Sequence, residues 1–208
     1  MKAKPIIFST EMVQAILEVR KSQTRRMNGL KKINEYPNDW VFEDFDFTGN
    51  FIFYNKSGDK ISIKPPYEAS DVLWVRETFV EFETWNELEQ IFSYHYKADF
   101  YDYTLKYRPS IYMPKEACRL FLKIKNIRIE RLNDISETDA IAEGVEKIAD
   151  YGTTGYKLYT EPDAAYSDID AVYSFESLWE SIKGKKSWSS NPWVWVIDFE
   201  QCKKPKNF

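Results

Sequence analysis

The residues near the C-terminal end of the sequence form a run that is apolar on both sides of an extended backbone. In residues 193–197 (Trp-Val-Trp-Val-Ile) every side chain is apolar, and Asp198 is the first polar residue. Successive side chains of a strand point to opposite faces, so a strand of this composition belongs in the middle of a sheet. The sequence therefore predicts a sheet that contains a central C-terminal strand.

Other segments carry the period of a strand or a helix. Extended patterns predict strands at 5–8, 51–54, 61–63, 72–78 and 94–98, the second and third forming a hairpin with a turn near Ser57-Gly58. Apolar residues at helical spacing predict helices after Ser9 or Thr10, after Ser136, and at 172–182 up to Gly184. The first helix is expected to end near 20–22, with 24–27 extended.

The alternation of apolar residues changes phase between 120–124 and 127–129. A period of two cannot change phase without an extra residue or a bend, so we expect a bulge or kink near Lys125-Asn126. The resulting prediction is a mixed α+β fold, with a small curled sheet or β-barrel and about three flanking helices.

The length of 208 residues suits a single domain. Two stretches, about 30–66 and 146–167, are interpreted as insertions into that domain. The second is rich in Gly, Tyr and polar residues and has no clear period, which predicts a long loop that could act as a lid.

Composition excludes several classes of function. The net charge of −4 argues against bulk electrostatic capture of long duplex nucleic acid. Two cysteines and one histidine are too few for a four-ligand zinc site, and we predict neither metal nor cofactor. The sequence has no signal-peptide pattern and no apolar stretch of about 18 residues, so we expect a cytoplasmic location and no membrane contact.

The segment Arg20-Lys21-Ser22-Gln23-Thr24-Arg25-Arg26 gathers cations around two hydroxyls. If the first helix persisted through it, Lys21 and Thr24 would share a face, and a lysine that loses its proton in a dry pocket could activate the Thr24 hydroxyl. Arg25 and Arg26 would then be available to bind an anionic ligand. The alternative is a solvated helix end whose cations favour the negative end of the helix dipole.

A carboxylate interrupts the apolar face of the strand at 72–78. Glu77 follows Leu73 and Val75 on one face by the period of two, so burial should raise its pKa unless a cation pairs with it. The cations of residues 20–26 are candidate partners, and a purely structural ion pair is the alternative. Arg76 lies on the opposite face of this strand.

A rigid loop contributes one more candidate residue. Two prolines keep residues 107–114 extended, so the loop can present Ser110 and backbone groups to a ligand. The same loop can equally be a plain connector.

The motif Lys21-Ser22-x-Thr24-x-Arg26, followed by Trp74-Val75-Arg76-Glu77-Thr78, resembles the ASCH domain, a member of the PUA-like superfamily. Segments 108–114, 129–136, 140–144 and 191–195 are similar to a longer ASCH group from bacteria and their phages. Two positions depart from the family pattern: Val19 stands where glycine is usual, and Ser22 replaces the common threonine.

This resemblance implies a small β-barrel with helices and a cleft that binds RNA or nucleotide-like ligands. One small relative is an amidohydrolase that deacylates acetylated cytidine, and its lysine, threonine and glutamate correspond to Lys21, Thr24 and Glu77. Thr24 would be the nucleophile, Lys21 its activator and Glu77 the group that handles the proton. Another relative has been linked to cleavage of single-stranded RNA.

Three functions are therefore open. The first is binding of RNA, a nucleoside or a modified base, with Arg25, Arg26 and Arg76 on phosphate and aromatic side chains stacked on bases. The second is amide hydrolysis on a modified cytidine-type nucleoside or base. The third is a phage-related interaction protein without a small ligand.

Overall fold

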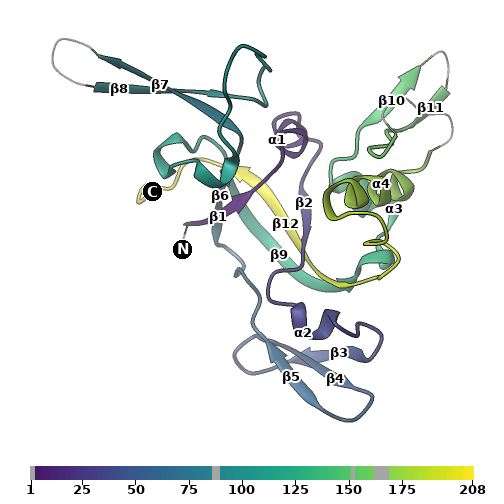
Figure 1. Cartoon of the computed structure of the whole chain (residues 1–208). Coiled ribbons are helices and arrows are strands. Elements are labelled where there is room, and N and C mark those ends of the chain that lie inside the picture. The colour runs from purple at the N-terminus through teal and green to yellow at the C-terminus, as the bar shows by residue number, and fades with distance from the viewer. Residues whose placement is uncertain (1–2, 86–89, 151–152, 162–168) are drawn as a thin grey trace. The chain divides into compact units, whose positions relative to one another are not determined.

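The computed structural model describes residues 3–85, 90–150, 153–161 and 169–208 (Figure 1). The protein is a mixed α+β fold, as predicted, and it consists of two compact units. Residues 1–19, 70–124 and 199–208 make up the first unit, and residues 20–69 and 125–198 make up the second. Each unit has a hydrophobic core of its own.

In the first unit, β1 (Ala3–Ile7) runs parallel to β6 (Val72–Arg76). On its other side, β6 pairs antiparallel with the beginning of β9 (Phe121–Arg131). Leu73 and Val75 of β6 are fully buried, which agrees with the apolar face predicted for this strand.

Helix α1 (Thr10–Leu17) follows β1 in the first unit. The hydroxyl of Ser9 accepts a hydrogen bond from the backbone N–H of Met12 at 3.3 Å, which confirms Ser9 as the N-cap. Val13 and Ile16 are fully buried on one stripe of the helix. The cap and the apolar stripe together explain why this short segment is helical.

The first unit also contains an antiparallel hairpin formed by β7 (Phe79–Trp85) and β8 (Gln90–Tyr96). The sequence had predicted only a strand at 94–98, and β7 was missed. Two single turns of 3₁₀ helix, η1 (Ser110–Tyr112) and η2 (Lys115–Ala117), come later in the chain. The core beneath these segments is formed by Val72, Phe79, Met113, Ala117, Cys118 and Phe121.

In the second unit, β2 (Gln23–Arg26) pairs antiparallel with β12 (Trp193–Cys202). The other neighbour of β12 is β9, so β12 is a central strand, as predicted. The side chains of residues 194–197 are completely buried. A strand that is apolar on both faces has thus been placed where both faces are covered.

Helices α3 (Glu137–Ala142) and α4 (Ala171–Lys183) pack beside each other in the second unit (Figure 1). Ser136 caps α3 and Gly184 ends α4 with a φ of +92°, both as predicted. The helices share a core with one face of β12. That core consists of Leu132, Ile135, Ala140, Val145, Ala171, Phe175, Leu178, Trp179, Val194 and Val196.

A three-stranded antiparallel sheet covers the other face of β12. It consists of β3 (Trp40–Phe45), β4 (Phe51–Asn55) and β5 (Lys60–Ile63), and β4–β5 is the predicted hairpin. Trp195 contacts Phe51 edge to face, with ring centroids 4.8 Å apart. The sequence predicted neither β3 nor the single-turn helix α2 (Lys31–Asn34).

Three expectations need correction or qualification. Part of the predicted loop at 146–167 is an antiparallel pair, β10 (Lys147–Asp150) with β11 (Thr153–Tyr156), while 151–152 and 162–167 lie outside the described residues. Strand β9 runs unbroken through 125–126, although both residues are exposed, so the burial phase does change there. Every sheet among the described residues is open, so the β-barrel alternative is wrong.

No helix among these residues has the length and apolar character to cross a membrane.

Candidate functional site

The predicted cationic segment, residues 20–26, begins after the first helix has ended and leads into a strand. Helix α1 ends at Leu17, and β2 begins at Gln23. Lys21 and Thr24 therefore lie outside the helix, and the argument that they share a helical face is wrong. Thr24 is instead extended, as predicted for residues 24–27.

The residue that ends the helical turn is in an unusual conformation for its type. Val19 has a φ of +61°, and its side chain is 82% exposed. This left-handed region is uncommon for a β-branched residue and easily reached by glycine. The structure thus explains why glycine suits this position, which is where the ASCH pattern has it.

The pairing of β2 with β12 sorts the predicted residues onto two faces. Directly opposed residues of an antiparallel pair share a face. Gln23 is opposite Asp198 and Arg25 is opposite Val196, on the side of α3 and α4. Thr24 and Arg26 point to the other side, where Trp195 packs on β4.

A buried ion pair lies on the α3 side of β2. The Nζ of Lys21 is 2.7 Å from Oε2 of Glu143 and 2.7 Å from the Glu143 carbonyl oxygen. The two side chains are 0% and 3% exposed. Burial lowers the pKa of the Lys21 ammonium, and the Glu143 carboxylate opposes that change.

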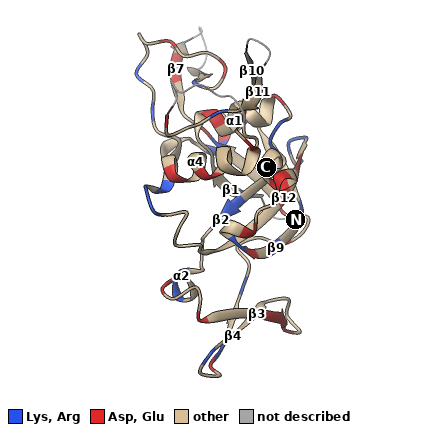
Figure 2. Ribbon diagram, turned by 90° about the vertical axis from the view of Figure 1, so that its right-hand side faces the viewer, with Lys and Arg blue, Asp and Glu red and all other residues tan. Residues whose placement is uncertain are grey.

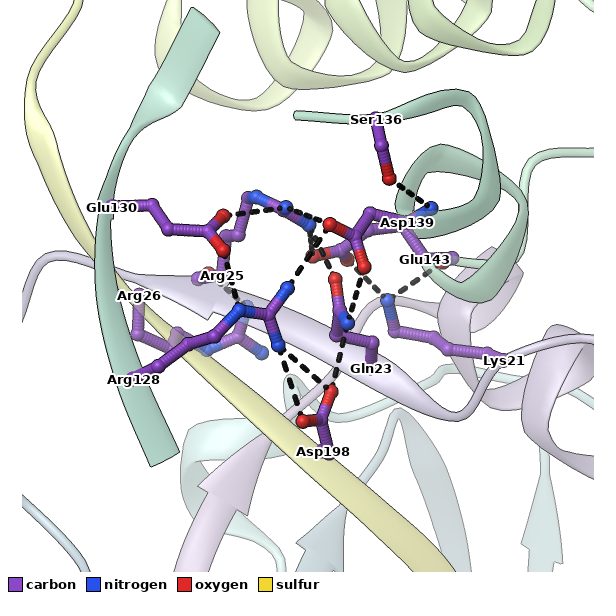
Figure 3. Close-up of polar contacts among 10 residues, drawn as sticks. All are labelled: Lys21, Gln23, Arg25, Arg26, Arg128, Glu130, Ser136, Asp139, Glu143 and Asp198. Carbon is purple, nitrogen blue, oxygen red and sulfur yellow. Dashed lines mark hydrogen bonds and ion pairs between the residues drawn. The ribbon is translucent and has the colours of Figure 1, made fainter. Parts of the chain in front are cut away.

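Arg25 is the centre of a larger network on the same side (Figure 3). Its fully buried guanidinium pairs with Glu143 at 3.1 Å, Glu130 at 3.2 Å and Asp139 at 3.5 Å. It also donates to Oε1 of Gln23 at 2.6 Å. Arg25 was predicted to bind ligand phosphate, and to do so it would have to give up these partners.

The sequence reading missed Arg128, which closes the network from β9. Arg128 pairs with Asp139 at 3.0 Å and Asp198 at 3.1 Å, and its Nε donates to Glu130. Burial lowers its pKa, but the hydrogen bond and charge of Glu130, with the charges of Asp139 and Asp198, outweigh burial and raise it. The sequence signal was the alternation of the charged Arg128 and Glu130 with apolar residues at 127 and 129 in β9.

Within this network the cations and acids neutralise one another. In Figure 2 the basic residues of β2 are blue. Figure 3 shows that carboxylates lie beside Lys21 and Arg25. Asp139 illustrates the balance: burial raises its pKa, but the Gln23 hydrogen bond and the charges of Arg128 and Arg25 outweigh burial and lower it. The network fixes β2 against α3 and leaves little cationic character on that face for a ligand.

The opposite face of β2 has a different character. Thr24 is fully buried, and its Oγ1 has no hydrogen-bond partner in the structure. Lys21 therefore does not contact the hydroxyl that it was predicted to activate. Arg26 is half-buried and donates to the Arg25 carbonyl at 3.1 Å. Burial lowers the pKa of Arg26, opposed by Glu143 and Tyr67.

Glu77 belongs to the first unit, where Arg119 is its partner. Nε and an Nη atom of Arg119 each lie 2.9 Å from a different Glu77 oxygen, a two-pronged contact. Glu77 is 1% exposed, and burial raises its pKa against the opposing effect of Arg119. The guanidinium also pairs with Asp99 at 2.7 Å and stacks on Tyr96 at 3.9 Å.

This arrangement matches the structural ion-pair alternative for Glu77. Arg119 was not predicted, because it lies 42 residues further along the chain without a local pattern. Glu77 is in the first unit, and Lys21 and Thr24 are in the second. The convergence of these three side chains therefore stays a prediction.

The last two predicted ligand residues are in the first unit. Arg76 donates to the carbonyl oxygen of Ile111 and lies over the Trp74 ring at 5.6 Å, and its buried Nε has no partner. Ser110 begins η1, and its carbonyl accepts from the N–H of Met113 at 3.1 Å. The structure thus joins Arg76 to the loop that carries Ser110.

The second unit also contains an open cavity of about 620 Å³ that the sequence did not predict. Its walls come from the β3–β4 turn, the segment after β5, and β9 at Asn126 and Ile127. Its size falls within the range of about 300–1,000 Å³ that is usual for small-molecule sites.

No group of three or more His, Cys, Asp or Glu side chains within the described ranges could hold a metal ion. No family model matches the chain, no curated protein matches its sequence, and no solved structure matches its fold.

Proposed function

We propose that this chain is a PUA-like protein of the ASCH type that binds RNA, a nucleotide or a modified nucleobase at β2. The observation that carries the proposal is the Thr24 hydroxyl, which is buried without a hydrogen-bond partner within the motif that resembles the family. A buried polar group without a partner costs about 1–3 kcal/mol, and such groups often mark functional sites.

The face that carries Thr24 supports an anionic ligand better than the opposite face does. Arg26 shares this face, and its half-buried guanidinium donates to the Arg25 carbonyl at 3.1 Å. A base could satisfy the Thr24 hydroxyl while Arg26 contacts a phosphate. The network beneath would hold both residues in place.

Binding of short single-stranded RNA, measured by fluorescence anisotropy at several salt concentrations, tests the proposal. Arg26→Gln should weaken binding and reduce the salt slope by about 0.7, the contribution of one phosphate on a single strand. Thr24→Val should weaken binding with an unchanged slope. Thr160→Val, at an exposed position, serves as the matched control.

Two outcomes would overturn the proposal. One is RNA affinity that stays the same in folded Thr24→Val and Arg26→Gln proteins. The other is no RNA or nucleoside binding to the wild type at any salt concentration. That second result would favour the interaction-protein alternative, in which a protein partner alone changes stability.

Hydrolysis of an acyl amide on a cytidine-type nucleoside is a second candidate function. One observation favours it: burial lowers the pKa of Lys21, as an amine that must accept a proton requires. Lys21 would have to leave Glu143 and reach Thr24. The Thr24 oxygen would attack the acyl carbon and give its proton to the neutral Lys21 amine, which would pass a proton to the departing cytidine nitrogen as the C–N bond breaks. Water would then hydrolyse the resulting ester.

Release of acetate from N4-acetylcytidine measures this activity directly. The hydrolase proposal expects turnover that is lost in both Thr24→Ala and Lys21→Ala. Turnover that survives both substitutions would exclude the assigned nucleophile and activator.

A further inference from the structure

The cavity of the second unit is lined largely by residues of the stretch 30–66, which the sequence predicted to be an insertion. The β3–β4 turn forms one wall, and the residues that follow β5 form another. None of Lys21, Thr24 or Arg26 lines it. The cavity is therefore made of different residues from the site on β2.

Aromatic side chains form part of the cavity wall. Phe45 is 52% exposed, although its ring lies edge to face against Phe51 with centroids 4.6 Å apart. Tyr67, which is almost buried, also contributes to the wall. Phe51 also lines the cavity, and the half-exposed phenyl ring of Phe45 is a surface on which another ring can stack.

Polar groups complete the lining. Asn50 and Asn126 also line it. The amide nitrogen of Asn50 donates to Asp46 and Thr48 and that of Asn126 donates to Asp198, so their amide oxygens are the groups that can accept from a ligand. Lys64 and Glu68 form an ion pair at 3.6 Å at the rim, with both side chains well exposed. A pair of this kind contributes little stability, so the Lys64 ammonium can turn to a ligand at small cost.

Hydrogen bonds hold the β3–β4 turn in place before any ligand binds. The carboxylate of Asp46 accepts from the backbone N–H groups of Thr48 and Asn50, at 2.8 and 3.0 Å. It also accepts from the side chains of Thr48, Asn50 and Ser62, at 2.6, 3.1 and 2.7 Å. The turn that joins Phe45 to Asn50 is therefore preorganised, which reduces the entropy cost of binding.

We propose that this cavity binds a planar heteroaromatic molecule of nucleoside size, with the ring stacked on Phe45 and its polar edge toward Asn50 and Asn126. The aromatic wall selects a ring, and the amide oxygens of Asn50 and Asn126 select an edge that carries hydrogen-bond donors, such as an exocyclic amino group. This is a site separate from β2, and it does not depend on the function proposed above.

Adenosine and cytidine are suitable probes, with ribose as the comparison compound that lacks a ring. Isothermal titration calorimetry and saturation-transfer NMR measure their binding to the full chain. Phe45→Ala should weaken nucleoside binding by about tenfold or more, the usual effect of losing one stacked ring. Phe47→Ala is the matched control, because Phe47 is fully exposed two residues away and does not line the cavity.

The site is supported if a nucleoside binds wild type and Phe47→Ala equally, binds Phe45→Ala weakly, and receives saturation from the protein at its base protons. Equal binding to wild type and Phe45→Ala would overturn it, as would ribose binding as well as the nucleosides, or no nucleoside binding at millimolar concentration. Thr24→Val should leave nucleoside binding here unchanged while it weakens RNA binding at β2. Failure of one site is thereby distinguished from failure of the other.

Discussion

Lys21 and Glu143 are 122 residues apart in the sequence, and in the structure the Lys21 ammonium lies 2.7 Å from the Glu143 carboxylate, with both side chains almost fully buried. The residue predicted to activate a nucleophile thus has an acidic partner within its own unit. The Lys21–Glu143 ion pair connects the start of β2 to the end of α3.

Removing Lys21 should destabilise the fold strongly. Lys21→Met leaves the Glu143 carboxylate paired with Arg25 but without Lys21, and breaking a buried pair costs about 3–5 kcal/mol. Urea denaturation at neutral pH measures this loss. Lys56→Met is the control, because it breaks an exposed pair with Asp39 and should cost less than about 1 kcal/mol. Similar losses in both variants would contradict the view that burial makes the Lys21 pair important.

Replacing Thr24 by valine should stabilise the ligand-free protein. The two side chains have nearly the same shape, and the change removes a buried hydroxyl that lacks a partner. We expect a gain of about 1 kcal/mol in the free energy of unfolding, measured by chemical denaturation. A loss of stability would mean that the hydroxyl has a partner in solution, such as a buried water.

Val19→Gly should also stabilise the protein. Glycine removes the strain of a β-branched residue at a φ of +61°, and this outweighs the extra freedom that glycine gives to the unfolded chain. We expect a gain of about 0.5–1 kcal/mol in thermal or urea unfolding. Val41→Gly, at an exposed position within β3, should instead lose about 0.5–1 kcal/mol.

The stability of the second unit should fall in acid because of Asp139. Its folded-state pKa is below the usual carboxyl value, so its contribution is complete above about pH 4 and is lost as the pH falls further. Asp139→Asn should therefore be less stable than wild type at pH 7, by about 1–3 kcal/mol. The difference should shrink in urea titrations below about pH 4. Asp134→Asn, at an exposed position, should show no such convergence.

Asp46→Asn should loosen the β3–β4 turn without unfolding the protein. The carboxylate of Asp46 accepts from the amides of Thr48 and Asn50, and a neutral side chain accepts more weakly. Hydrogen exchange at these two amides should accelerate by up to about tenfold. Asp59→Asn, in the neighbouring β4–β5 turn, should leave both rates unchanged. Unaltered exchange in Asp46→Asn would contradict the preorganisation of the cavity wall.

Local patterns predicted the elements whose causes are local. The Ser9 and Ser136 caps, the β4–β5 hairpin and the central β12 all follow from residues close together in the chain. Strands β3 and β7 were missed because their charged residues and exposed faces weaken the period of two. These strands are defined by the partner strands that complete their hydrogen bonds.

The candidate site was predictable only in part for the same reason. The sequence predicted a buried Glu77 that needs a cationic partner, but it proposed Lys21 and the neighbouring arginines for that role and treated Arg25 as a ligand-binding residue. It could not identify Glu143 as the partner of Lys21 or Arg119 as that of Glu77, because their sequence separations are 122 and 42 residues. Tertiary folding decides such pairs, and a resemblance in one short motif does not contain that information.

The strict alternation of side chains along β2 makes this segment sensitive to changes in its length. Adding or deleting a single codon between Gln23 and Arg26 would interchange the two faces, turning Thr24 toward the carboxylates and Arg25 toward Trp195. Glu130, Asp139 and Glu143 would lose their contacts with Arg25 at once. Variants of this gene that tolerate such insertions or deletions should therefore be very rare in a deep mutational library, while substitutions at exposed Ser22 should be common.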